Sequence, residues 1–385
     1  MYSIHDYGIM ITDSGRMNAY AKALEQTVKP GSVVADIGTG TGIFALIACR
    51  LGARRVYAIE PQDAIQLARE IAHANGFADR ITFVQDLSTR VTLPEPVDVI
   101  VSDLRGALPL YQNHVTAIMD ARQRWLAPGG SLIPRQDTLW MALAENAKLF
   151  DNQMSAWHTT PYGLDLSPGQ GPAANTLYKS RVDPEQLLTP PQVCAVLDYE
   201  RISSPDVAMV LDWRVTRAGV CHGISVWFDA LLAEGVSFSN APGNPELIYG
   251  NAFLPWPRPV HLERGDRARL RLQVKLVHDR YIWTWDTLVF AGEQTETGSV
   301  KADFRQSTFF GEIWSPQQLR KRASGYRPRL HEEGRIVHSV LQLMNSERSL
   351  GEIAEWISRR FPGRFCGRNA ALTFVGDLAE RYSQP

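Results

Sequence analysis

A glycine-rich loop between an apolar strand and an apolar helix constrains the fold of this chain more than any other feature. Residues 36–42 (DIGTGTG) follow the apolar run 33–37 and precede the apolar helical segment 43–51. Glycines let a backbone turn sharply and approach a ligand, and the N-terminus of the next helix favours negative charge. The loop therefore predicts a ligand site. We expect the loop contacts to be Asp36, Gly38, Thr39, Gly40 and Gly42.

The segments after the loop alternate between strand-like and helix-like patterns. Apolar runs at 56–60, 81–84 and 97–101 predict strands, and the three-residue spacing of apolar residues in 64–74 predicts a helix. Strands that alternate with helices indicate a parallel sheet wound with helices. The fold class predicted for residues 1–135 is therefore α/β and Rossmann-like.

Residues 136–315 differ in composition: they are rich in tryptophan and proline and contain short runs of strand-forming residues. The runs at 223–228, 268–274 and 281–285 predict antiparallel strands of a second, β-rich domain. We expect an exposed loop at 167–172 (SPGQGP). Three aromatic residues alternate along one predicted strand: Tyr281, Trp283 and Trp285. Aromatic residues in this arrangement pack a barrel core more often than they line a pocket, so we expect a core role.

Residues 316–385 again have the apolar spacing of helices. The apolar residues of 336–344 share one helix face, and a last helix is predicted at 372–382. Ser349 and Glu352 fit a capping box at the start of a helix that Phe361-Pro362 ends. A third, helical module is therefore predicted at 316–385.

Composition and charge exclude several classes of protein. The formal net charge is −1, so the chain lacks the basic excess of a dedicated nucleic-acid binder. The four cysteines are far apart, which predicts free thiols and no zinc site or other metal site. The N-terminus has no signal-peptide pattern and no apolar run is long enough to span a membrane, so we expect a soluble cytoplasmic protein.

An acid beyond the loop narrows the choice of ligand. Glu60 ends the next predicted strand, 22 residues after Gly38, where a carboxylate accepts hydrogen bonds from a ribose diol. A dinucleotide loop reads GxGxxG, but Gly42 comes four residues after Gly38. Asp36 disfavours a pyrophosphate and suits a ligand with an ammonium group. S-adenosylmethionine, whose product is S-adenosylhomocysteine, fits best; a nicotinamide cofactor and a structural turn are the alternatives.

Further segments resemble a known family. Residues 10–16 (MITDSGR) with Tyr20 are similar to the M-L-x-D-x-x-R-x-x-x-Y helix of the protein arginine methyltransferases and their bacterial relatives. Residues 124–134 (RWLAPGGSLIP) are similar to that family's W-L-A-P-x-G-x-x-x-P segment, and 162–167 and 182–187 resemble its arm and barrel. The resemblance extends from residue 1 to about 310.

This resemblance implies an architecture and one cofactor contact. It implies a class I methyltransferase domain over 1–135 and a β-barrel substrate domain over 136–315, with a dimerisation arm at about 150–190. A homodimer is a family expectation. Arg16 would bind the carboxylate of the cofactor, a charge-assisted pairing, although the residue alone reads equally as a surface arginine.

The acceptor loop departs from the family pattern. The family holds a guanidinium with two glutamates, the first in S-E-W-M-G and the second nine residues later. Here residues 102–106 read SDLRG and Gln112 takes the second position, while the T-H-W loop of the barrel is replaced around 246–249. One charge pair at about 4 Å is worth about 4 kcal/mol at an effective dielectric of about 20. The changes therefore weigh against peptidyl arginine, unless Glu246 enters the pocket.

Several side chains at this loop are candidates for chemistry. Asp103 ends the fourth strand, at the sheet edge where such folds bind ligands, and is expected to orient the acceptor or act as its base. Capping of the next turn is the alternative. Gln112 is a predicted substrate contact, and Arg105 would pair with a substrate carboxylate or phosphate unless it is a surface arginine. His114 is a further candidate base, although a lone helix histidine is more often structural.

Other predicted contacts come from the turn after the third strand and from the barrel. By resemblance, Ser88 and Thr89 face the adenine, with Asp86 as an alternative. Glu246 and Tyr249 are expected to contact the substrate from the replaced loop.

The C-terminal segment resembles a second kind of module. Residues 335–382 are similar to the helical part of PqqD-like modules, notably at Leu341, Ser349, Ile353 and Phe361. Such modules bind leader peptides of ribosomally made natural products by adding a strand to a sheet edge. A small helical cap on the barrel is the alternative.

These observations lead to one function and three rivals. The sequence predicts an S-adenosylmethionine-dependent methyltransferase that acts on a nitrogen, less often an oxygen, of a peptide or small metabolite, with natural-product biosynthesis as one setting. The rivals are an arginine N-methyltransferase that uses Asp103 with Glu246 on peptidyl or free arginine, a non-catalytic binding module, and a nicotinamide dehydrogenase.

Overall fold

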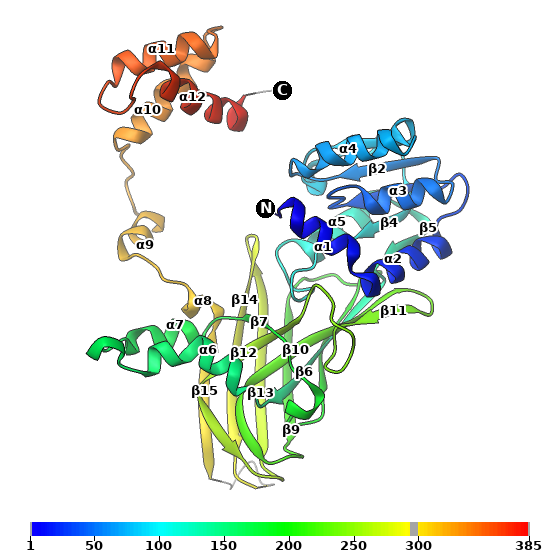
Figure 1. Cartoon of the computed structure of the whole chain (residues 1–385), viewed down its shortest axis with the longest axis vertical. Helices are drawn as coiled ribbons and strands as arrows, with labels where there is room; N and C mark the ends of the chain where they lie inside the picture. The colour runs from blue at the N-terminus through cyan, green and yellow to red at the C-terminus, as the bar shows by residue number, and fades with distance from the viewer. Residues whose placement is uncertain (1, 293–298, 384–385) are drawn as a thin grey trace. The chain divides into compact units, whose positions relative to one another are not determined.

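The chain folds into two compact units in the computed structural model. The structure describes residues 2–292 and 299–383. One unit spans Met1–Ile313 and the other Trp314–Pro385 (Figure 1). Among the described residues, no helix is long and apolar enough to cross a membrane. The cysteines there are free, as predicted: Cys49, Cys194 and Cys221 are buried and Cys366 is exposed.

A parallel sheet of five strands forms the first layer of the larger unit. The strand order is β3-β2-β1-β4-β5, and each pair runs parallel, which confirms the predicted α/β class. Chain order reverses between β1 and β4, so ligands are expected beyond the carboxyl ends of these two strands. The strands are β1 (Val33–Ile37), β2 (Arg55–Ile59), β3 (Ile81–Val84), β4 (Val97–Ser102) and β5 (Leu126–Ile133).

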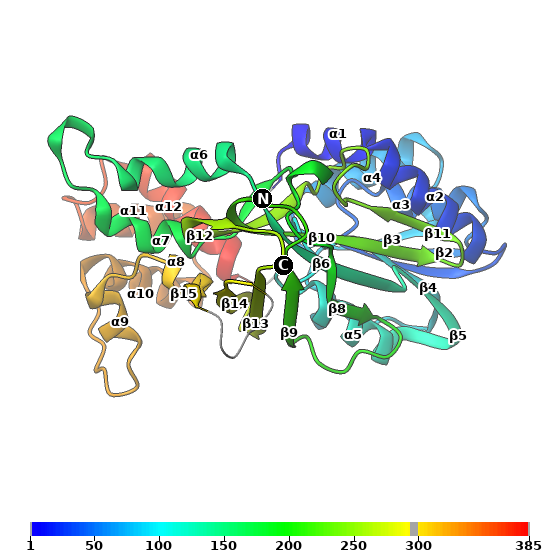
Figure 2. The same ribbon diagram turned by 90° about the horizontal axis from the view of Figure 1, so that it is seen from below.

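Helices cover both faces of this sheet (Figure 2). Helices α3 and α4 lie on one face and α5 lies on the other. The predicted spacing in α4 is confirmed, because Ile65 and Ala68 are fully buried. The helices and short 3-10 turns are α1 (Ile4–Thr12), α2 (Ser14–Thr27), α3 (Ile43–Arg50), α4 (Ala64–Ala74), η1 (Ala78–Arg80), η2 (Ser88–Arg90) and α5 (His114–Trp125).

Two antiparallel sheets form the predicted barrel-like domain. One has the order β7-β12-β10-β6-β8, with β11 beside β10, and the other has the order β15-β14-β13-β9. Trp213, Trp256 and Trp285 are fully buried, as expected of core aromatics. The strands are β6 (Gln136–Ala144), β7 (Tyr178–Ser180), β8 (Gln192–Asp198), β9 (Val207–Arg214), β10 (Gly219–Ala233), β11 (Val236–Ser239), β12 (Asn251–Leu262), β13 (Arg267–Val277), β14 (Arg280–Phe290) and β15 (Val300–Ser307).

The predicted loop at 167–172 is wrong, because residues 167–169 form a 3-10 helix and an α-helix begins at Gln170. A 3-10 turn there leads into helix α7, because proline is compatible with a first helical turn and the alanines of α7 bury against α6. Phe150 and Met154 of α6 form this small cluster with Ala173 and Ala174. The elements outside the sheets are α6 (Ala147–His158), η3 (Pro161–Gly163), η4 (Ser167–Gly169), α7 (Gln170–Ala174), η5 (Pro184–Gln186) and α8 (Thr308–Gly311).

The second unit is built from helices around its own core. Its helices are α9 (Pro316–Arg322), α10 (Glu332–Met344), α11 (Leu350–Arg360) and α12 (Arg368–Tyr382), and residues 314–383 contain no strand. The predicted capping box is confirmed: the Glu352 amide donates to Ser349 Oγ at 3.3 Å and the Ser349 amide donates to Glu352 Oε2 at 2.8 Å. Ile336, Val340 and Ile353 are fully buried in the core.

The separate core of the second unit can be tested with a pair of variants, one at a buried and one at an exposed residue of the same helix. Ile353 is 1% exposed, whereas Leu350 in the same helix is 41% exposed. We expect Ile353→Ala in the full chain to destabilise the second unit by about 2–5 kcal/mol, because it leaves a cavity. Leu350→Ala should change stability much less. Hydrogen–deuterium exchange checks both, and faster exchange in the first unit after Ile353→Ala would contradict a separate core.

Candidate functional site

The glycine loop builds a cradle around two buried acids. Asp36, in β1, is fully buried. Its Oδ2 accepts hydrogen bonds from Thr39 Oγ1 at 2.5 Å and from the Ala45 amide at 3.0 Å. Its Oδ1 has no hydrogen-bond partner among the described residues. Burial raises the pKa of Asp36 to about 7, so this carboxyl group is poised to gain a donor from a ligand.

Glycine is required in the cradle by conformation and by space. Gly38 has a φ of +72°, and a Cβ there would lie 2.2 Å from Leu104 Cδ2. Gly40 has a φ of +54°, and a Cβ there would lie 2.7 Å from the Tyr7 ring. Left-handed backbone of this kind favours glycine. Gly42, with a φ of +87°, is the N-cap of α3.

Glu60 faces the same loop from the end of β2. Its Oε2 accepts from the Gly40 amide at 3.1 Å, and its Oε1 accepts from the Gln62 amide at 2.9 Å. Only 7% of the residue is exposed, and burial raises the pKa of the carboxyl group. The structure thus brings the two acids and the glycines of the sequence prediction together at one place.

Asp103 lies at the carboxyl end of β4 and accepts hydrogen bonds from three side chains. Its Oδ2 accepts from Arg16 Nε at 2.5 Å and from the Tyr249 hydroxyl at 2.6 Å. Its Oδ1 accepts from Arg105 Nη1 at 3.0 Å. The two guanidinium groups overcome the effect of burial and hold the pKa of Asp103 at about 2. A general base needs a higher pKa and a free oxygen, so the structure does not support Asp103 as the base.

Arg105 is not a surface arginine, and its guanidinium does not face a substrate. The side chain is fully enclosed, with Nε donating to Asp137 Oδ2 at 2.8 Å and Nη2 donating to Asp137 Oδ1 at 2.7 Å. Nη1 also donates to the Tyr20 hydroxyl at 2.7 Å. The expected pairing with a substrate anion is therefore corrected: its partner is Asp137, an acid of the barrel strand β6.

Two further groups complete this buried cluster. The Tyr199 hydroxyl donates to Asp137 Oδ2 at 2.6 Å and lies 2.9 Å from His114 Nε2. Burial lowers the pKa of His114, which favours the neutral ring, and a base role for this enclosed side chain is not supported. Sequence reasoning missed Asp137 and Tyr199. The signal for Asp137 was its place on the apolar side of an alternating strand, with Leu139 and Met141 buried beside it.

Other predicted site residues lie apart from Asp103. Gln112 is exposed, in a left-handed conformation with a φ of +42°, and donates to the Tyr111 hydroxyl. Glu246 is exposed and pairs with Arg181. Neither side chain reaches Asp103 among the contacts of the described residues, because each projects to solvent. Tyr249 is the residue of the replaced barrel loop that reaches Asp103.

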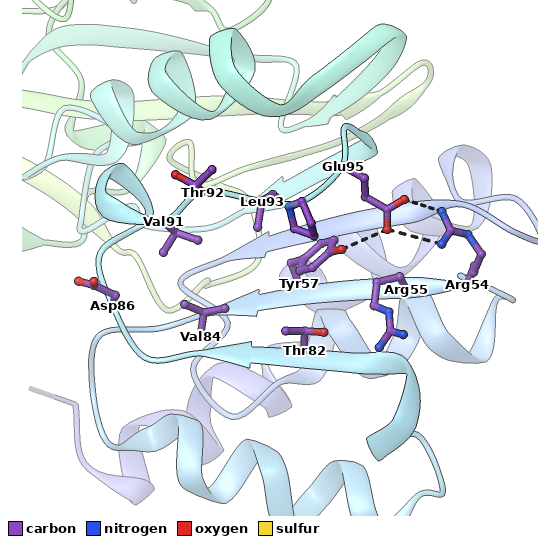
Figure 3. A pocket seen from close by; sticks show the side chains of 11 residues that line it. Arg54, Arg55, Tyr57, Thr82, Val84, Asp86, Val91, Thr92, Leu93 and Glu95 are labelled. Atoms are coloured by element: carbon purple, nitrogen blue, oxygen red, sulfur yellow. Dashed lines mark hydrogen bonds and ion pairs between the residues drawn. The ribbon is translucent and has the colours of Figure 1, made fainter. Parts of the chain in front are cut away.

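The remaining predicted contacts lie in the segment that follows β3. Ser88 is buried and Thr89 is exposed in the short turn η2, which follows β3. A separate cavity of about 610 Å³ lies between β2, β3 and the segment 91–95 (Figure 3). Its lining includes Asp86 but not the glycine loop or Asp103. Glu95 closes one end by pairing with Arg54 and Tyr57.

Comparison with protein families matches both parts of the larger unit. Residues 19–133 match the ribosomal protein L11 methyltransferase family (PrmA), and residues 135–282 match the arginine methyltransferase oligomerization subdomain. The parallel-sheet part is therefore similar to a methyltransferase family, and the barrel-like part is similar to the arginine methyltransferase oligomerization subdomain.

Individual relatives point to the same family. The chain is 31% identical over 245 residues to probable protein arginine N-methyltransferase 6 of Arabidopsis thaliana, covering 61% of this chain and 55% of the relative. It is 28% identical over 275 residues to protein arginine N-methyltransferase 1 of Saccharomyces cerevisiae, covering 69% and 78%. The matched region thus spans about half of the first relative and over three quarters of the second.

Solved structures share the fold. Arabidopsis thaliana protein arginine methyltransferase 10 aligns with a TM-score of 0.68 at 23% identity, covering 79% of this chain and 97% of that one. The Trypanosoma brucei PRMT1 enzyme–prozyme heterotetrameric complex with AdoHcy aligns with a TM-score of 0.70 at 23% identity, covering 80% and 98%. The predicted resemblance is confirmed: the chain is similar to protein arginine methyltransferases and shares their fold.

The raised pKa of Asp36 predicts a pH-dependent stability. Between about pH 4 and pH 7 the folded carboxyl group keeps a proton that the unfolded chain has lost. Stability should therefore fall as pH rises, by at most about 1.4 kcal/mol per pH unit. The Asp36→Asn variant has no titrating group at this position. Its free energy of unfolding relative to that of the wild type should therefore rise from pH 5 to pH 7. Urea unfolding at pH 5, 6 and 7 measures the difference, and a constant difference would contradict the assignment.

Proposed function

We propose that this chain transfers a methyl group from S-adenosylmethionine to a nitrogen of a peptide or small metabolite, leaving S-adenosylhomocysteine. The observation that carries the proposal is the cradle at the switch point of the parallel sheet, with its glycine loop and paired acids. Oxygen is the less favoured acceptor atom. A nicotinamide cofactor is disfavoured, because the loop lacks the GxGxxG spacing and Asp36 places an acid close to where a pyrophosphate would lie.

The residues of the cradle fit S-adenosylmethionine. The unpartnered Asp36 Oδ1 suits a cationic or hydroxyl donor, and Glu60 keeps acceptor capacity for a ribose diol. Arg16, whose guanidinium lies 5.3 Å from the Phe44 ring at the start of α3, would hold the carboxylate. When bound, the ligand supplies an electrophilic methyl group on a sulfonium. We propose that Ser88 and Thr89 border the adenine.

The protein's part in the reaction is mainly positioning. Methyl transfer is an in-line displacement, which needs the acceptor nitrogen held close to the methyl group and water excluded. Asp103 and the neighbouring Tyr249 would line the place where the acceptor binds. Because the two neighbouring guanidinium groups hold the pKa of Asp103 at about 2, the acceptor's proton would leave to water.

An arginine N-methyltransferase remains the second candidate, since the relatives named above carry that activity in their names. The charges at the site weigh against it, because Arg105 already pairs with Asp103 and Glu246 is exposed beside Arg181. A non-catalytic module is a third candidate; one solved neighbour is an enzyme–prozyme complex.

Association and peptide recruitment are further parts of the proposal. We expect a homodimer formed through the arm at about 150–190, which light scattering would test; the match to an oligomerization subdomain supports it. The helical unit at 316–385 is proposed to dock a peptide acceptor. Because residues 314–383 contain no strand, docking would use helix faces and not an added strand from this unit.

Glu60→Gln tests the cofactor. Loss of a charged acceptor for the ribose hydroxyls should weaken S-adenosylhomocysteine binding by about ten- to hundredfold. Glu95→Gln is the matched control, because Glu95 lies at the separate cavity and pairs with Arg54. Isothermal calorimetry of both variants and of NADH with the wild type measures this. Equal affinity in the two variants, or NADH binding, would refute the cofactor assignment.

The acceptor is tested with methyl-labelled S-adenosylmethionine and extract of the source organism, separated by size. Label in a peptide or small-molecule fraction, on a nitrogen other than arginine nitrogen, is the expected result. Methylarginine in the hydrolysate would establish the second candidate. Cofactor binding without transfer to any acceptor would favour the non-catalytic module.

A further inference from the structure

Arg105 connects the Asp103 carboxylate to the barrel-like domain. Its Nη1 donates to Asp103 Oδ1 at 3.0 Å, and its Nη2 and Nε donate to the two oxygens of Asp137 at 2.7 and 2.8 Å. The side chains of Arg105 and Asp137 are fully enclosed, and that of Asp103 is 4% exposed. A planar guanidinium with two parallel hydrogen bonds holds its orientation strongly. Asp137, a residue of β6, therefore fixes the donor that meets Asp103.

Other contacts hold the pair from several sides. The Tyr199 hydroxyl donates to Asp137 Oδ2 at 2.6 Å, and Arg105 Nη1 donates to the Tyr20 hydroxyl at 2.7 Å. The guanidinium also lies 5.6 Å from the centre of the Phe228 ring. These side chains come from α2, from β10 and from the residue after β8. The position of Arg105 is therefore built by the parallel-sheet part and the barrel-like domain together.

We expect Arg105 to stay on Asp103 when Arg16 binds the cofactor. In the proposed function Arg16 turns from Asp103 Oδ2 to the cofactor's carboxylate, so Oδ2 keeps the Tyr249 hydroxyl and can also accept from the methyl acceptor. Arg105 cannot make the same turn, because two hydrogen bonds tie its guanidinium to Asp137. One positive charge and two negative charges then remain in this buried group, which favours an acceptor that donates a hydrogen bond.

The ionisation of Asp103 depends on a small set of neighbours. Burial raises the pKa of its carboxyl group, and Arg16 and Arg105 lower it. With Arg16 on the cofactor, Arg105 is the remaining cation of this set that favours the ionised form. The other titratable groups that interact with Asp103 are Tyr2, Tyr20, His114 and Tyr249.

We propose that Arg105, anchored on Asp137, is the positioning residue that fixes the Asp103 carboxylate for the methyl acceptor. The inference rests on the proposed function and adds two residues to its acceptor side. Arg105 and Asp137 act through Asp103 and do not contact the acceptor themselves. Methyl transfer needs the acceptor atom in line with the carbon–sulfur bond, and a misplacement of about 1 Å costs about a hundredfold in rate. The barrel-like domain thus controls the alignment of the acceptor.

Two double variants separate positioning from general damage. Arg105→Met with Asp137→Asn removes the cation and its counter-charge together. Lys301→Met with Asp266→Asn is the matched control: it removes another ion pair of the barrel-like domain, whose hydrogen bonds within the described residues do not reach Asp103. Both are assayed from pH 5 to pH 8 with saturating labelled S-adenosylmethionine and the extract fraction that takes label from the wild type. Calorimetry with S-adenosylhomocysteine reports the cradle independently.

We expect Arg105→Met with Asp137→Asn to lower the rate by about tenfold or more at pH 8, with S-adenosylhomocysteine affinity within about threefold of the wild type. The ratio of wild-type to variant rate should grow about threefold from pH 8 to pH 5, because loss of Arg105 raises the pKa of Asp103. The acceptor's own titration cancels in this ratio. The control should stay within about twofold of the wild type.

A rate within about threefold of the wild type at pH 8, or a ratio that stays constant from pH 8 to pH 5, would overturn the proposal. The constant ratio is what a merely structural role of the ion pair predicts. Failure of the wild type to bind S-adenosylhomocysteine or to transfer label would instead refute the proposed function.

A measurement on the wild type guards against a double variant that does not fold. Protein with carbon-13 in its aspartate carboxyl groups is saturated with S-adenosylhomocysteine, and the NMR signal of Asp103 is identified by its absence in Asp103→Asn. The proposal predicts that this signal keeps its ionised position from pH 8 to pH 5, because Arg105 remains beside the carboxylate. A titration midpoint above pH 5 would overturn it.

Discussion

The buried ion pair between Arg105 and Asp137 is the interaction on which the acceptor side of this molecule depends. Arg105 follows β4 of the parallel sheet, and Asp137 belongs to β6 of the barrel-like domain, so the pair joins the two layers. Removal of one partner from such a pair leaves an uncompensated buried charge, at a cost of about 3–5 kcal/mol. Tyr199 and Tyr20 satisfy further polar atoms of the pair. The packing of the two domains therefore fixes the surroundings of Asp103.

The two halves of the site differ in what they leave for a ligand. In the cradle, Asp36 Oδ1 is buried without a partner and Glu60 keeps acceptor capacity, so this half lacks the donors that a ligand would bring. On the acceptor side, the donors and acceptors around Asp103 are paired among themselves. One fold can host different chemistries when only part of its site changes. In this chain the cradle keeps a buried polar atom without a partner, whereas the polar groups around Asp103 are paired with one another.

Local sequence patterns predicted much of the fold and the cradle. The apolar spacing that buries Ile65 and Ala68 and the capping box of Ser349 and Glu352 depend on neighbours three or four residues away. The glycine loop is likewise local, since Gly38 and Gly40 need left-handed backbone at fixed positions. The helix at 170–174 escaped prediction because its alanines gain stability only from contacts with α6.

The sequence alone determined the α/β class, the glycine-loop cradle with its acids, the β-rich region and the capped helix, because each follows from a periodicity or spacing within one segment. Tertiary structure decided the acceptor side. It placed Arg105 on Asp137, 32 residues away, brought Tyr249 to Asp103 across 146 residues, and left Gln112 and Glu246 in solvent. Burial decides whether a charged residue meets a substrate or an internal partner, and burial depends on strand pairing between domains that no local pattern specifies.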